Sequence, residues 1–282
     1  MSRSPATVFL ALSLSLVACE TSTPPAAPPP PPAQVEPPVA PPPQLDKAAL
    51  EAQARDVILV PSPTEMQKAL TQAGVAQGLS ALVPSGAPNM TVEDRDVIAV
   101  RTGTVLAYAL LTVKDAPKET LVERLGHVKA GMSALGAGTD INATIDDMVG
   151  RMNSESLSRD DMLAELDEIH GAVIPEIEYE AGPKVVPLIK AGSWLAGVNL
   201  IAQAVVKSGD ATAGTKLLRQ PEVADYFLKY VRSEGAGKAP PEVMTKLDAT
   251  LTHLKELAAK PELTMDDVKD IESQTGAVLS LL

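Results

Sequence analysis

Residues 183–207 decide the fold of this chain, and they read PKVVPLIKAGSWLAGVNLIAQAVVK. Apolar residues occupy nearly every side of the helix that this stretch would form, and a helix that is apolar all round is buried. A membrane span is the alternative interpretation, but Lys190, Asn199 and Gln203 interrupt the run, and no basic cluster flanks it. We therefore expect residues 183–207 to form a buried central helix. Its small residues, Ala191-Gly192-Ser193 and Ala196-Gly197, would allow other helices to approach closely.

The rest of residues 46–282 reads as a series of amphipathic helices. Leu121, Leu125 and Val128 illustrate the pattern, because spacings of three and four place apolar side chains on one helix face. No run alternates apolar and polar residues as a half-buried strand would. The sequence therefore predicts an all-α domain, a multi-helix bundle around the central helix, with further helices over residues 46–55, 63–73, 92–113, 117–135, 141–152, 159–171, 221–233, 241–259 and 265–281.

Several helix ends carry recognisable signals. Ser62, Ser158 and Thr264 are each followed three residues later by an acidic residue, the spacing of a capping box. Thr91 is the expected N-cap of the helix over 92–113. Pro175 is expected to end or kink the helix that begins at residue 159, because proline lacks the backbone N–H.

The N-terminus carries an export signal. Arg3 precedes an apolar run from Val8 to Val17, which is too short to span a bilayer. The run closes on Leu16-Val17-Ala18-Cys19, which resembles the lipobox of bacterial lipoprotein precursors. The resemblance implies a signal peptide over residues 1–18, cleavage before Cys19, and a membrane anchor of acyl chains on that thiol. An ordinary signal peptide or an uncleaved anchor are the alternatives.

The residue that follows Cys19 bears on whether the lipoprotein is sorted to the inner or the outer membrane. Glu20 stands where enteric lipoproteins retained at the inner membrane have aspartate, so the resemblance favours the outer membrane, with the domain facing the periplasm. Cys19 is the only cysteine, so no internal disulfide can form.

Residues 19–45 are rich in proline, including an unbroken run from Pro28 to Pro32. Proline fixes φ and removes the amide donor, so we expect a disordered tether with extended polyproline II character. The tether would hold the domain away from the membrane. Recognition of its PxxP motifs by a partner is the alternative.

A second resemblance concerns the domain. Val60-Pro61-Ser62-Pro63, together with the segment from Ala191 to Gly197, resembles an uncharacterised group of helical bacterial envelope lipoproteins. In that group a Gly-Gly-Trp-like helix recurs, whereas this chain has Ser193 in place of the second glycine. The resemblance implies a helical fold and no particular chemistry.

Composition excludes some classes of partner. The formal net charge is −12, and loss of Arg3 with the signal peptide makes it −13, which disfavours binding to nucleic acid or to anionic lipid headgroups. Aromatic residues make up 2% of the chain, so a stacking platform for sugars or single-stranded nucleic acid is not expected.

Each of the three histidines has a carboxylate one helical turn away: Glu123 with His127, Asp167 with His170, and His253 with Glu256. Such pairs on facing helices can build metal centres in bundles. Solvated pairs on helix surfaces are the interpretation that we favour. Two of the three acidic doublets (146–147, 160–161 and 266–267) lie in first helical turns, where carboxylates interact favourably with the helix dipole. The calcium-loop pattern is missing, so helix capping explains the doublets better than cation binding. The sequence therefore predicts no metal and no cofactor, and Cys19, through lipidation, is the only site residue.

Two functions remain open. The first is a non-catalytic envelope lipoprotein, a binding or structural module that acts through protein contacts, because no catalytic motif is recognisable. The second is a small-ligand carrier or helical enzyme with a pocket between the central helix and the helix over 221–233. That helix holds Tyr226, Phe227 and Tyr230, although simple core packing would also explain these rings. A cavity of several hundred Å³ with convergent polar groups would favour the second function.

Overall fold

The computed structural model describes the backbone of residues 63–86, 88–235 and 241–282, and the side chains of these residues apart from 63 and 169–175. The described residues belong to one compact unit, residues 47–282. The signal peptide, Cys19, the tether, the helix over 46–55 and the Ser62 cap therefore lie outside the described part, as does the side chain of His170.

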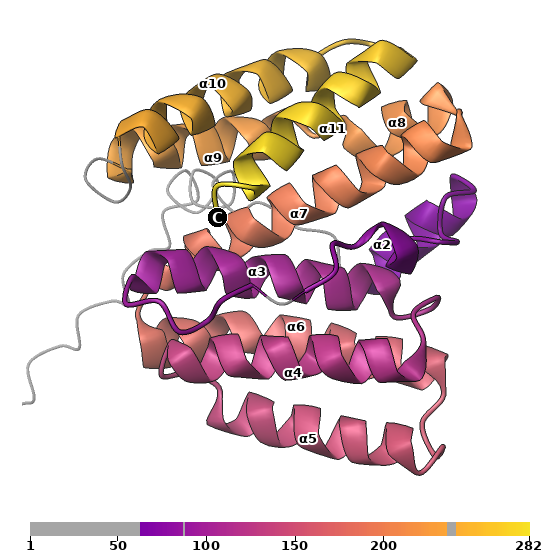
Figure 1. The fold of residues 1–282 in the computed structure, drawn as a ribbon, viewed down its shortest axis with the longest axis vertical. Helices are drawn as coiled ribbons and strands as arrows, with labels where there is room; N and C mark the ends of the chain where they lie inside the picture. The colour runs from indigo at the N-terminus through magenta and orange to yellow at the C-terminus, as the bar shows by residue number, and fades with distance from the viewer. Residues whose placement is uncertain (1–62, 87, 236–240) are drawn as a thin grey trace, which may run out of the picture. The chain divides into compact units, whose positions relative to one another are not determined.

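The described residues form helices joined by short connections, and they contain no strand (Figure 1). The all-α class that the sequence predicts is thus confirmed. In chain order the helices are α2 (Pro63–Gln72), the 3₁₀ helix η1 (Ser80–Leu82), α3 (Arg95–Thr112), α4 (Lys118–Ala134), α5 (Thr139–Asn153), α6 (Arg159–Ala181), α7 (Val185–Ser208), α8 (Ala211–Leu218), α9 (Pro221–Glu234), α10 (Pro241–Ala258) and α11 (Met265–Leu279).

Helix α7 is the centre of the bundle. It packs against α3 on one side and α11 on the other, and it also contacts α6 and α8 (Figure 1). No residue from Val185 to Val206 is exposed, which confirms the central helix predicted from the apolar stretch. By length and mean hydropathy this helix could cross a membrane, but 61% of the relevant window is buried against other helices. Its surroundings are those of a core helix.

Helices α3 and α7 approach each other closely where they cross. A Cβ atom on Gly192 would lie 2.0 Å from the carbonyl oxygen of Val100, and one on Gly103 would lie 1.9 Å from that of Ile189. Two glycines, one on each helix, therefore allow the two backbones to touch. The small residues of the apolar stretch thus serve close helix packing, as the sequence predicts for Gly192.

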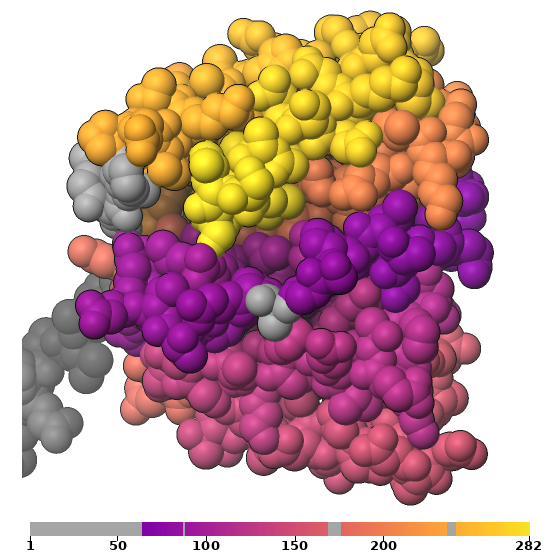
Figure 2. All heavy atoms as spheres, viewed as in Figure 1, coloured from indigo at the N-terminus to yellow at the C-terminus, as the bar shows by residue number. Residues whose placement is uncertain are grey.

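The remaining helices extend the bundle on both sides of this crossing. Helix α4 packs on α3 and α5 packs on α4, while α10 packs against both α9 and α11 (Figure 1). On the face shown in Figure 2, residues 63–112 form a band between α4 and α5 on one side and α10 and α11 on the other. Separate apolar clusters fill the two sides: one is centred on Leu121, Leu125 and Met132, the other on Leu200, Val205 and Ile271.

Two expectations about helix ends need correction, and one helix was not predicted. Helix α3 begins at Arg95 rather than 92, because the side chain of Asp94, not Thr91, accepts hydrogen bonds from the amides of Asp96 and Val97. Helix α6 passes Pro175 and continues to Ala181. Ile177 is fully buried there, and this burial offsets the hydrogen bond that proline removes. Helix α8 was not foreseen, since it has only eight residues, with Asp210 as its cap.

Candidate functional site

An apolar pocket of about 140 Å³ lies where α7 meets α9 and α10. Trp194 and Leu188 of α7 form one wall, and Phe227 and Tyr230 of α9 form another. The rest of the lining comes mainly from aliphatic side chains of α3, α10 and the C-terminal end of the chain, among them Val97, Val100, Met244, Leu247, Val278 and Leu282. The pocket is therefore at the place that the sequence suggests for a ligand, between the central helix and the aromatic helix.

The aromatic rings hold one another in place. The centroids of Trp194 and Phe227 are 5.3 Å apart with a tilt of 35°, and Tyr226 meets Phe227 edge-on at 5.2 Å. The indole N–H of Trp194 donates to the side-chain oxygen of Gln220 at 3.1 Å. Offset and edge-on pairs of this kind are favourable arrangements of aromatic rings. One face of the pocket is thus preorganised.

The chemistry that this pocket offers is burial of an apolar group. Asp96 has the only side-chain carboxylate among the described lining residues, and none of them is a lysine, arginine, histidine or cysteine. The volume matches that of a cavity known to admit a benzene-sized molecule, about 150 Å³. The pocket is smaller than several hundred Å³ and lacks convergent polar groups, so it suits an apolar side chain or ring better than an enzyme substrate.

A second, polar pocket of about 340 Å³ lies between α3, α4 and the connection that precedes α3. Tyr108, Glu123, Arg124 and His127 line it, with Thr120 and residues 83–86. Arg124 is 9% exposed, and its guanidinium donates to the hydroxyl of Ser80 at 3.1 Å, to the carbonyl of Ser80 at 3.2 Å and to the hydroxyl of Thr112. Burial lowers the pKa of Arg124, while Asp115 and Glu123 partly oppose this shift.

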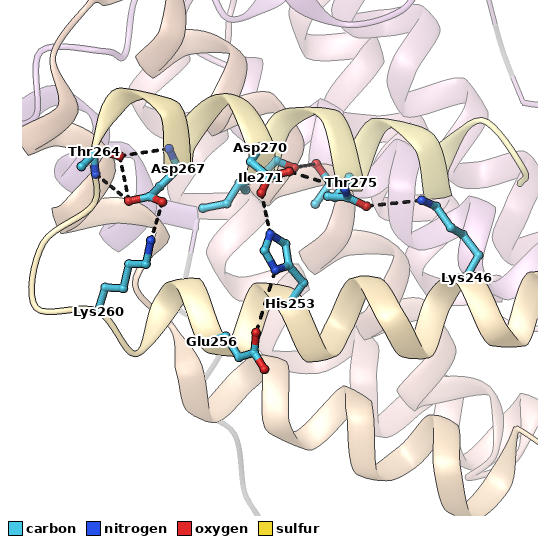
Figure 3. A network of polar contacts seen from close by, with 10 residues as sticks. Lys246, His253, Glu256, Lys260, Thr264, Asp267, Asp270, Ile271 and Thr275 are labelled. Carbon is cyan, nitrogen blue, oxygen red and sulfur yellow. Dashed lines mark hydrogen bonds and ion pairs between the residues drawn. The ribbon is translucent and has the colours of Figure 1, made fainter.

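The histidine–carboxylate pairs do not come together as a metal centre among the described residues. Glu123 and His127 face the same polar pocket, on α4. His253 of α10 bonds instead to Asp270 of α11, 2.5 Å away, with Glu256 at 4.0 Å (Figure 3). No group of three or more histidine, cysteine or acidic side chains in the described part is placed to hold a metal ion. Asp167 accepts a hydrogen bond from the amide of Thr64 at 2.9 Å.

The acidic doublets lie at helix starts and in ion pairs. Asp161 accepts a hydrogen bond from Ser158 at 2.6 Å, and Asp267 forms a capping box with Thr264 (Figure 3). These contacts confirm the helix-start interpretation of both doublets. The third doublet pairs with cations, since Asp146 contacts Lys129 and Asp147 contacts Arg151 at 2.8 Å.

The arginine-centred pocket is the feature that sequence reasoning missed. Arg124 is the sequence neighbour of Leu125, which belongs to the apolar face of α4. A charged residue at the border of an apolar face was the only feature of the sequence that pointed to this pocket. Its partner Ser80 is 44 residues away, so only the fold brings the two together. Comparisons of the chain with known protein families, with curated proteins and with solved structures found no match.

Proposed function

We propose that this chain is a lipid-anchored protein of the bacterial envelope whose helical domain acts by binding rather than by catalysis. The anchor would be Cys19, at the end of the lipobox-like Leu16-Val17-Ala18-Cys19, and the proline-rich residues 19–45 would hold the domain away from the membrane. Glu20 supports sorting to the outer membrane, with the domain in the periplasm. An acidic domain in that place is suited to protein partners rather than nucleic acid.

The observation that carries the binding role is the apolar pocket beside Trp194. It has a fixed aromatic wall, a concave apolar lining and a single described side-chain carboxylate, and the residues that dominate interface energies bind in well-packed, desolvated pockets. A lining without acid, base or nucleophile in convergent positions supports recognition of an apolar side chain of a partner protein. We therefore place the partner's anchor residue in this pocket.

The anchor is tested by metabolic labelling. Cells that produce the chain are supplied with an alkyne-tagged fatty acid, and the wild-type protein is compared with Cys19→Ala. We expect label on the wild type, none on the variant, and retention of the uncleaved, unlabelled precursor. Equal labelling of the two proteins would exclude lipidation at Cys19.

The binding role is tested by site-specific photocrosslinking in intact cells. A photoreactive phenylalanine analogue replaces Leu188, which is half-buried and lines the pocket, and as a control it replaces Ala130, which is exposed on α4. We expect a discrete protein adduct from position 188 and none from position 130. Adducts of the same size from both positions, or none from position 188, would argue against a protein partner at this pocket.

A small-ligand carrier is the second candidate, favoured by the position of the pocket between α7 and α9. Trp194 is the only tryptophan, so its fluorescence reports directly on this pocket. If the protein is a carrier, a small apolar molecule should copurify with it and its removal should change the emission of Trp194. A protein isolated without such a molecule, whose emission is unchanged by extraction, contradicts this alternative.

A further inference from the structure

The polar pocket beside Arg124 lies on α3 and α4, shares no lining residue with the apolar pocket, and has a lining of different chemistry. Val83, Pro84, Pro88 and Val105 supply an apolar part, while Tyr108, Thr120, Glu123, Arg124 and His127 supply polar groups. A pocket that combines an apolar wall with a few polar groups is the usual form of a small-molecule site. Its volume, about 340 Å³, has room for a molecule of several heavy atoms.

Arg124 is a buried charge without an ion pair among the described residues. Its three hydrogen bonds go to neutral oxygens, two of Ser80 and one of Thr112. Burying a charge is costly unless it is paired, and the guanidinium stays protonated in proteins. A positive charge held in this way, next to an open pocket, favours an anionic group on whatever enters.

The pocket has hydrogen-bond donors that are available to such an anionic group. A guanidinium has five N–H groups, and those of Arg124 make three hydrogen bonds, which leaves its Nε–H and one Nη2–H without a partner in the described structure. Tyr108 and Thr120 line the same pocket, and their hydroxyls likewise have no hydrogen-bond partner among the described residues. Burial raises the pKa of Tyr108, so its hydroxyl keeps the proton that it would donate.

Glu123 affects which charged groups a ligand of this pocket must have. Its carboxylate also lines the pocket, although it is adjacent to Arg124 in sequence and forms no ion pair with it within 4.0 Å. A simple anion would be repelled by Glu123, whereas a molecule with one negative and one positive group would find a partner for each. Electrostatic complementarity of this kind selects the ligand class.

We infer that the pocket beside Arg124 binds a small zwitterion of the amino-acid class, with its carboxylate at Arg124, Tyr108 and Thr120 and its ammonium at Glu123. The apolar part of the lining, Val83, Pro84, Pro88 and Val105, suits an aliphatic side chain. This inference rests on a different pocket from the proposed partner site, so either can fail without the other.

The test is isothermal titration calorimetry of the full chain with three matched probes. L-leucine carries both charges, 4-methylpentanoate lacks the ammonium, and 3-methylbutylamine lacks the carboxylate. We expect leucine to bind at least about tenfold more tightly than either of the other two, since charge-assisted hydrogen bonds on both ends contribute. No saturable heat with leucine, or equal affinity for leucine and 4-methylpentanoate, would overturn the inference.

Variants separate the ligand contacts from the fold. Arg124 also holds Ser80 and Thr112, so its removal would disturb the fold around these residues. By contrast, Glu123→Gln and Tyr108→Phe break no side-chain hydrogen bond or ion pair of the described structure. Glu123→Gln should bring the affinity for leucine down to that for 4-methylpentanoate, and Tyr108→Phe should weaken both about three- to tenfold. Glu119→Gln, an exposed position on the same helix, should change neither. An equal effect of Glu119→Gln and Glu123→Gln would show a non-specific charge effect and contradict the site.

Discussion

At the scale of single residues, the glycines at the α3–α7 crossing set how closely the two core helices approach. The atoms opposite Gly192 and Gly103 are backbone carbonyls, which cannot rotate away as a flexible side chain would. Any side chain at these positions must separate the helices or unpack one of them, because protein interiors are close-packed. Both positions therefore require glycine itself, and another small apolar residue would not fit.

Gly192→Ala should destabilise the domain by about 1–3 kcal/mol, the usual cost of overpacking a core. The matched control is Gly126→Ala on α4, where an added Cβ meets nothing within 4 Å. This control should stabilise by about 0.5–1 kcal/mol, since alanine has less backbone freedom to lose in a helix. Urea unfolding followed by circular dichroism measures both free energies. Similar changes in the two variants would contradict the close crossing.

At the scale of helices, α11 is fixed by local contacts at its start and by polar contacts to α10. The side chain of Asp267 accepts from the amide of Thr264 at 2.9 Å and from Lys260 at 2.6 Å (Figure 3). The pKa of Asp267 is lowered, first by the hydrogen bond from Lys260 and then by that from the Thr264 amide. Deeper in the helix, Thr275 meets Asn199 of α7 at 2.9 Å, which ties α11 to the core.

The stability of the domain should therefore fall in acid partly through Asp267. A carboxyl whose pKa is lower in the folded state stabilises the protein above its unfolded pKa, near 4, and loses that contribution as the pH falls through the folded pKa. Asp267→Asn should cost about 0.5–2 kcal/mol at pH 7 and much less at pH 2, so that its stability changes less with pH. Asp146→Asn, at an exposed ion pair with Lys129, is the control and should follow the wild-type pH dependence. An unchanged pH profile for Asp267→Asn would contradict the role of this carboxylate.

Helix ends set by local hydrogen bonds could be predicted from the sequence, whereas those set by tertiary packing could not. The caps at Ser158 and Thr264 are local, and both were predicted correctly. The passage of α6 beyond Pro175 depends on burial of Ile177 in the tertiary structure, which no local signal contains. The pocket between α7 and α9 could be foreseen, because apolar and aromatic residues cluster in those two helices; the pocket around Arg124 could not, because Ser80 and Thr112 reach it only through the fold.

At the scale of the whole molecule, α7 connects the two sides of the bundle. Its first half packs in the cluster with α3, α4 and α6, and its second half packs in the cluster with α2, α8 and α11. Asn199, a buried polar residue in this helix, is satisfied by the carbonyl of Glu272 and the hydroxyl of Thr275, both at 2.9 Å. Because one helix packs in both clusters, we expect the two sides to unfold together.

Ile201→Asp should unfold the described domain, because Ile201 is 3% exposed and an unpaired carboxylate in that place is not compensated. Ala130→Asp, an exposed position on α4, introduces the same charge at the surface and should change stability by about 0.5 kcal/mol or less. Circular dichroism at 222 nm during heating compares the two. A folded Ile201→Asp protein with the wild-type melting temperature would show that α7 is not buried as described.

Amide hydrogen exchange of the full chain, resolved by residue, tests the central role of α7 most directly. A core helix exchanges only through global unfolding, whereas peripheral elements open locally at lower free energy. We predict that amides from Ile189 to Val205 are among the slowest in the chain, with opening free energies equal to that of global unfolding, and that those of α5 exchange faster. Exchange of the α7 amides as fast as those of α5, in a chain that is otherwise folded, would contradict a bundle built around this helix.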